Sequence, residues 1–138
     1  GLKIINQVSK KYKLKIRTKK YDFLNLGNIN LIKKNSIIFT YNSVMCIPNL
    51  KKRYFEKIIE KNPKIVIHFE AVYMDKPKNN LQRLSNKYFN NCDYNKTFLN
   101  ELNKLNKEKK INLKILKRKI SSNILLNEKI VIWKPVTI

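Results

Sequence analysis

The stretch that most constrains the fold is KIVIHFEAVY, residues 64–73, which directly follows Pro63. A strand with one wet face alternates apolar and polar residues, but this one opens with three β-branched apolar residues, Ile65 to Ile67. Such a run is typical of a strand covered on both faces, as in α/β proteins. Because ligands of open α/β sheets bind beyond the carboxyl ends of the strands, His68 and Glu70 mark the expected functional site.

The flanking segments predict alternating helices and strands. Segment 36–41, a helix over 50–61 and the strand at 64–73 form a strand–helix–strand unit with parallel strands. The last two predicted strands are joined by too few residues for a crossover helix, so we expect an antiparallel pair. The helical patterns cover 2–12, 50–61, 81–90 and 93–109, and the strand patterns cover 14–21, 36–41, 64–73, 111–120 and 129–135. We expect one domain over residues 1–138.

The charge of +22 suggests a polyanionic partner such as nucleic acid. However, Lys, Asn and Ile together make up 66 of the 138 residues, which is the bias of an AT-rich coding sequence. The lysines are also spread along the whole chain and do not form one block. We therefore expect non-specific, salt-sensitive polyanion binding, which does not require a dedicated surface.

Several classes of protein are disfavoured. No apolar run approaches the roughly 18 residues of a membrane span, and the N-terminus does not resemble a secretory signal, so we expect a cytoplasmic protein without membrane contact. The single histidine and the two distant cysteines predict no metal site. The nine acidic residues are scattered, which argues against a metal-dependent nuclease.

Three segments carry a family resemblance: KIVIHFEAVY, then KYFNNCDYNKTFLNEL, then KIVIWKPV. In order and spacing they resemble the C-terminal half of a poorly characterised bacterial group of class I S-adenosylmethionine-dependent methyltransferases, over residues 14–136. Ala71 stands where that group carries Pro. The resemblance implies a partial Rossmann-like three-layer sandwich. Its mostly parallel sheet would close with an antiparallel strand pair and lack the first two strands.

The resemblance also implies a site for S-adenosylmethionine. Asp22 would hydrogen-bond the adenine amino group and Phe23 would pack on the ring, while Thr40 and Asn42 would end the strand where donor and acceptor meet. The alternative is a turn Asp, a core Phe and satisfied strand-end side chains. The chain has only two glycines and no Gly-x-Gly, so the Gly-rich loop that holds the donor in this family is missing.

The strand end at His68 and Glu70 suggests general-base chemistry. Two residues apart on a strand, they share a face, and a carboxylate beside an imidazole raises its basicity. The alternative is that His68 bonds a backbone carbonyl and Glu70 pairs with a Lys. Tyr73, Tyr94 and Asn95 are candidate substrate-binding residues, although Tyr94 could be a core aromatic and Asn95 a helix-start residue.

Two functions remain open. One is a methyltransferase-like domain for a small polar or sugar-like acceptor, incomplete and inactive as this chain alone. The other is a non-enzymatic basic module that binds RNA or another polyanion. A sheet without its first two strands leaves an open edge at 36–41, so we expect a homodimer or a strand-swapped partner.

Overall fold

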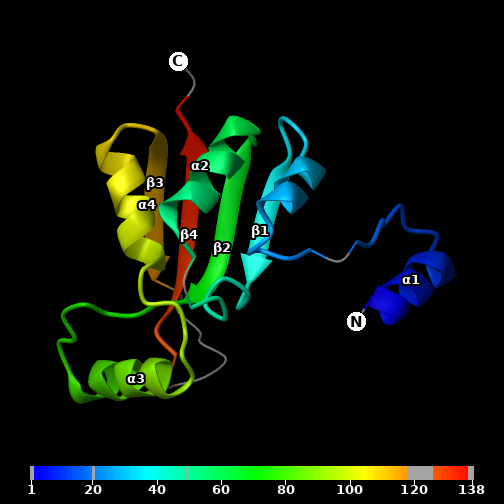
Figure 1. Ribbon diagram of the computed structural model, residues 1–138. Coiled ribbons are helices and arrows are strands. Elements are labelled where there is room, and N and C mark those ends of the chain that lie inside the picture. The colour runs from blue at the N-terminus through cyan, green and yellow to red at the C-terminus, as the bar shows by residue number, and fades with distance from the viewer. Residues whose placement is uncertain (1, 20, 49, 118–125, 137–138) are drawn as a thin grey trace.

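The computed structural model describes residues 2–19, 21–48, 50–117 and 126–136. Figure 1 shows a sheet with helices beside it and an N-terminal helix held away from the body. The elements in chain order are α1 (Leu2–Lys11), the 3-10 helix η1 (Leu26–Leu31), β1 (Ile37–Tyr41), α2 (Lys52–Glu60), β2 (Ile65–Ala71), α3 (Asn80–Asn91), α4 (Phe98–Lys107), β3 (Ile111–Lys117) and β4 (Glu128–Pro135).

The four strands form one mixed sheet in the order β1-β2-β4-β3. Strands β1 and β2 are parallel, which confirms the predicted strand–helix–strand unit, and β3 and β4 are the predicted antiparallel pair. The expectation of a mostly parallel sheet is wrong. Because β4 inserts between β2 and β3, two of the three strand contacts are antiparallel.

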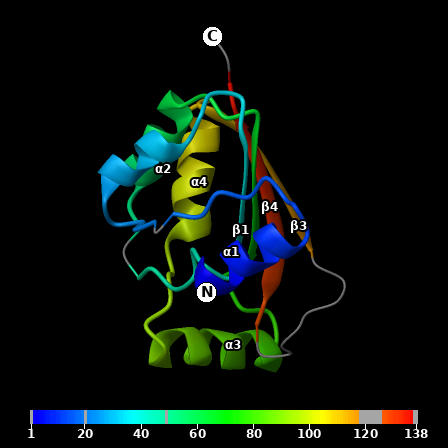
Figure 2. The ribbon, with the colours of Figure 1, turned by 90° about the vertical axis from the view of Figure 1, so that its right-hand side faces the viewer.

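Helices α2 and α4 cover one face of the sheet (Figure 2). Their apolar residues recur at helical spacing, with Tyr54, Phe55 and Ile58 on α2 and Phe98, Leu102 and Leu105 on α4. These side chains are buried against the residues of β2 and β4 that point the same way, Val66, Val131 and Trp133. This single layer of contacts forms the main hydrophobic core.

The opposite face of the sheet carries no helix among the described residues (Figure 2). Along β2, the buried residues Val66, His68 and Glu70 alternate with the half-buried Ile65, Ile67 and Phe69. The expectation of a strand covered on both faces, and with it a three-layer sandwich, is therefore not met here. The apolar run specifies two apolar faces, but a sequence pattern does not identify what covers each of them.

The N-terminal region differs most from expectation. Helix α1 forms as predicted, yet none of its residues is buried. The strand predicted at 14–21 is wrong, because the described residues of this stretch belong to no strand, and the Ile16 N–H donates locally to the Leu14 carbonyl. Alternating Lys and apolar residues fit an exposed irregular segment as well as an edge strand, so the pattern alone does not distinguish them.

Helix α3 lies across the lower end of the sheet in Figure 1, below the carboxyl ends of β1 and β2. It contributes Phe89 to a second, smaller core with Met45 and Ala71. The part of the predicted strand 111–120 beyond Lys117, and most of the connection to β4, lie outside the described residues. Within the described chain, none of the helices combines the length and apolarity needed to cross a membrane.

Candidate functional site

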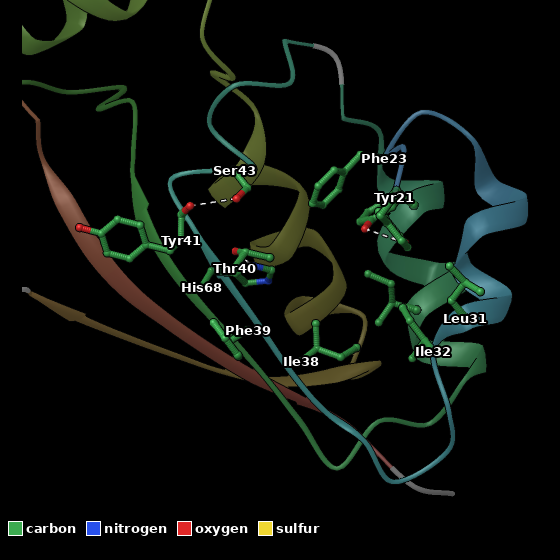
Figure 3. Close-up of a pocket in the computed structure, with 12 residues that line it drawn as sticks. Tyr21, Phe23, Leu31, Ile32, Ile38, Phe39, Thr40, Tyr41, Ser43 and His68 are labelled. Atoms are coloured by element: carbon green, nitrogen blue, oxygen red, sulfur yellow. Dashed lines mark hydrogen bonds between the residues drawn. The ribbon is translucent and has the colours of Figure 1, made fainter. Parts of the chain in front are cut away.

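A cavity of about 510 Å³ lies beside the edge strand β1 (Figure 3). Figure 3 shows Tyr21, Phe23 and Ile32 on one side and Ile38, Thr40 and Ser43 on the other. The remaining lining residues are Leu31, Phe39, Tyr41, Tyr54, Ile58 and His68. The walls are mainly apolar and aromatic, with a few polar groups at the strand end, which is the usual composition of a small-molecule site.

The polar floor of the cavity is a chain of hydrogen bonds that starts in the core. Trp133 Nε1–H donates to His68 Nε2 over 3.0 Å. Because indole nitrogen can only donate, Nε2 must be the acceptor and Nδ1 carries the proton of the neutral ring. His68 Nδ1 then donates to Thr40 Oγ1 over 2.8 Å, and Thr40 donates to Glu70 Oε1 over 2.7 Å. Because the Trp133 N–H can only donate, it fixes the donor and the acceptor of every hydrogen bond in this series.

Glu70 anchors this chain to the loop after β1. Its side chain is completely buried. Oε1 also accepts the backbone N–H of Ser43 over 3.1 Å, and Oε2 accepts that of Met45 over 3.2 Å. The carboxylate is therefore held by three donors and fixes the loop that closes the end of the cavity. Among the residues that the structure describes, no lysine forms an ion pair with it.

His68 is poorly suited to act as a general base. Both ring nitrogens are engaged, the side chain is 2% exposed, and burial lowers the pKa of His68 to about 3. A base needs a pKa near the working pH and a lone pair within reach of the substrate. The geometry instead favours a positioning role, in which His68 orients the Thr40 hydroxyl.

Within this series of hydrogen bonds, Thr40 is the residue that lines the cavity and still has a free lone pair for a ligand. Its proton goes to Glu70 and one lone pair accepts from His68, which leaves one lone pair of the hydroxyl oxygen. Since Thr40 lines the cavity, that lone pair can accept a hydrogen bond from a ligand O–H or N–H group.

Of the residues that the resemblance assigned to the cofactor, Phe23 and Thr40 both line the cavity. The Phe23 ring packs edge-on against Tyr21, with ring centroids 5.2 Å apart. Asp22 is adjacent but exposed, and its Oδ1 accepts the backbone N–H of Leu24 over 2.9 Å. The turn interpretation of Asp22 is thus present in the structure, while Phe23 faces the cavity.

Asn42 directly follows β1 and lies in the left-handed region, with φ of 45°, a conformation that Asn tolerates better than most residues. Its backbone N–H donates to the carbonyl oxygen of Phe69 over 2.9 Å. Within the described structure its Oδ1 is buried without a hydrogen-bond partner. Asn42 shapes the turn beside the cavity but is not among the lining residues.

The residues proposed for the substrate lie elsewhere. Tyr73 and Tyr94 pack against Phe89 in the small core under α3 and do not line the cavity. Asn95 is 2% exposed, its Oδ1 accepts the backbone N–H groups of Thr97 and Phe98, and its Nδ2 donates to the Ile47 carbonyl. Asn95 therefore satisfies the start of α4, which is the alternative predicted for it as a helix-start residue.

Sequence reasoning missed three residues of the site. Tyr21 and Tyr54 meet across the cavity wall with their hydroxyl oxygens 3.2 Å apart, and burial raises the pKa of both phenols. Trp133 lies 65 residues from His68 in sequence. The aromatic character of these positions is visible in the sequence, but their partners are set by the sheet order.

Searches for relatives found no matching protein-family model, curated protein or solved structure.

Proposed function

We propose that this chain is a methyltransferase-like ligand-binding domain whose cavity beside β1 binds the adenosine portion of S-adenosylmethionine. The acceptor would be a small polar or sugar-like molecule. The observation that carries the proposal is the cavity itself, which brings Phe23 and Thr40 together at the carboxyl end of the parallel pair. This is the position where open α/β sheets bind ligands.

The chemistry of the lining supports a nucleoside. Phe23, with Tyr21 and Tyr54 packed around it, offers an aromatic surface for a purine ring. The Thr40 oxygen offers an acceptor for a ribose hydroxyl or an amino group, oriented by His68 and Glu70. S-adenosylmethionine, when bound, supplies an electrophilic methyl group, and the residues of this chain would bind and orient it.

The proposal does not extend to catalysis by this chain alone. With only Gly1 and Gly27 in the sequence, there is no Gly-rich loop to hold the methionine part of the donor. The buried, neutral His68 also leaves no evident base for a weakly nucleophilic acceptor. We therefore expect ligand binding without measurable methyl transfer.

Calorimetric titration of the chain with adenosine, S-adenosylmethionine and S-adenosylhomocysteine tests the proposal. Stacking of a base on an aromatic side chain contributes about 1–3 kcal/mol, so Phe23→Ala should weaken binding by roughly 5- to 150-fold. Phe23→Tyr, which keeps the ring, should bind nearly as the unsubstituted chain does.

Leu24→Ala is the matched control, because Leu24 is adjacent, 70% exposed and not part of the cavity wall. Its binding should be unchanged. If the folded chain binds none of the three compounds, or if Leu24→Ala and Phe23→Ala weaken binding equally, the proposal is wrong.

A further inference from the structure

The sheet face opposite α2 and α4, on which no described helix packs, is an ordered apolar array. Side chains of directly paired residues point to the same side, so the strand register places twelve residues on this face in three rows. Nine are apolar, namely Ile37, Phe39, Tyr41, Ile65, Ile67, Phe69, Leu116, Ile130 and Ile132, and we call these nine residues the open face. The other three are Asn112, Lys114 and Lys134. Apolar residues thus make up three quarters of the array but 43% of the whole chain, which indicates a surface that binds something apolar.

Helix α1 carries the complementary surface. Its apolar residues are all exposed, with Leu2 at 45%, Ile4 at 63%, Ile5 at 41% and Val8 at 40%. They follow a helical period, with Lys3, Lys10 and Lys11 elsewhere on the helix. An isolated ten-residue helix is marginal in water, so its stability must come from packing of the apolar side.

Helix α1 lies beyond the edge strand β1 and away from its own body (Figure 1). The segment after it folds back on the helix, since Leu14 N–H donates to the Ser9 carbonyl and Thr18 Oγ1 donates to Asn6 Oδ1. Residues 2–18 therefore form a self-contained arm. An arm of this kind, joined beside an open sheet, is the usual starting geometry for exchange between copies.

We propose that two copies of this chain exchange their arms, so that α1 of each copy packs on the open face of the other. The exposed fractions of the four apolar α1 residues amount to about 1.9 whole side chains, which at roughly 180 Å² each is about 350 Å² of apolar surface, and the open face offers at least a similar area. One helix on one sheet would remove about 700 Å² from water, but a reciprocal exchange removes about 1,400 Å², within the ~1,200–2,000 Å² of stable interfaces.

The competing occupant of the open face is single-stranded nucleic acid, because exposed rings on a four-stranded sheet can stack bases. Phe39 is 71% exposed, and the chain is strongly basic. However, six of the nine open-face residues are aliphatic, and Lys114 and Lys134 are the only cations in the array. The composition of this surface favours helix packing over base stacking.

The two occupants respond oppositely to salt. Both copies carry +22, so added salt screens their repulsion and should strengthen the dimer. Nucleic-acid binding weakens with salt. Sedimentation velocity of the whole chain at about 0.1 M and 0.5 M NaCl should therefore show a several-fold lower dimer dissociation constant at the higher concentration.

Substitutions on the two surfaces locate the contact. Ile4→Asn with Val8→Asn on the arm, and separately Phe39→Thr on the open face, should each raise the dimer dissociation constant about tenfold or more. The matched control is Leu84→Asn on α3, where an equally exposed Leu, at 48%, lies on neither surface. Circular dichroism on every variant shows whether the sheet is still folded. Only variants with the strand signal of the unsubstituted chain are compared, so that a higher dissociation constant reports loss of the contact and not unfolding.

Cysteine pairing separates exchange from closure of the arm on its own body. In a chain with Cys46→Ser and Cys92→Ser, Val8→Cys and Phe39→Cys are made on separate molecules and then mixed under oxidising conditions. A crosslinked mixed dimer, absent from either variant alone, supports the exchange. Three results would overturn the exchange. They are a chain that stays monomeric at all concentrations, a dimer unaffected by the arm substitutions, and a crosslink that forms only when both cysteines are on one chain. Salt-sensitive binding of oligo-uridine that Phe39→Thr abolishes, without a dimer, would assign the face to nucleic acid.

Discussion

At the scale of single residues, the site depends on how one imidazole is held. The chain has one histidine, so its NMR signals belong to His68 without further assignment. The Trp133 contact requires the tautomer with the proton on Nδ1. That His68 and Glu70 share a face was predictable from their spacing, but the intervening Thr40 comes from another strand and could not be inferred locally.

The first prediction concerns the pH dependence of stability. The pKa of His68 falls from 6.5 to about 3 on folding because the ring is buried, so the unfolded chain binds one more proton between these values. The stabilising contribution is complete above pH 6.5 and decreases as the pH falls toward 3, by about 1.4 kcal/mol per pH unit. Long-range ¹⁵N–¹H correlation spectra should show neutral, Nδ1-protonated imidazole at pH 5. Titration near pH 6.5, or a proton on Nε2, would contradict the hydrogen-bond chain.

The second prediction concerns Thr40. Thr40→Val removes the hydroxyl that links His68 to Glu70 and leaves two buried polar groups without this partner. Leaving a buried polar group without a partner costs about 1–3 kcal/mol, so urea unfolding should show a decrease in the free energy of unfolding in that range. Thr18→Val, which removes an exposed hydroxyl bond to Asn6, should change stability by less than about 0.5 kcal/mol. If both substitutions change the free energy of unfolding equally, the buried hydrogen bonds of Thr40 contribute no more to stability than the exposed bond of Thr18.

At the scale of elements, the periodic segments were predictable and their neighbours were not. The helices at 52–60 and 80–91 and the strands β1, β2 and β4 follow apolar spacing in the sequence. The predicted strand at 14–21 failed because an alternating pattern becomes a strand only where a partner strand offers hydrogen bonds. The helix predicted over 93–109 begins later, at Phe98, and Asn95 accepts the Phe98 backbone N–H, in line with its alternative prediction as a helix-start residue.

The third prediction tests that helix start. Asn95→Ala removes two acceptor contacts to the first turn of α4 and the donor contact to Ile47. A lost cap costs about 0.5–2 kcal/mol, and loss of the bond to the half-buried Ile47 carbonyl adds to this, so we expect about 2 kcal/mol less stability by urea unfolding. Asn103→Ala, on the exposed side of the same helix, should be neutral or slightly stabilising because Ala favours helix. A neutral Asn95→Ala would show that the loop before α4 is held by other contacts.

At the scale of the whole molecule, the sequence predicted an α/β domain that ends in an antiparallel strand pair, and the structure has one. It did not predict that the described helices would cover one face of the sheet and leave the other, because the residues that will cover an apolar face leave no local signal. The candidate site divides in the same way. Phe23, Thr40 and His68 line one cavity, with Glu70 buried behind Thr40, whereas Tyr73 and Tyr94 belong to a separate core.

The most direct test of the central claim is a ¹⁵N–¹H NMR titration with S-adenosylhomocysteine, a ligand without the net negative charge that a basic protein binds non-specifically. We predict saturable shifts that are largest at the amides around the cavity, at residues 21–23, 31–32 and 38–43, and small at β3 and α3. The absence of shifts up to millimolar ligand, or shifts centred on Tyr73 and Tyr94, would contradict the proposal that this cavity binds a nucleoside.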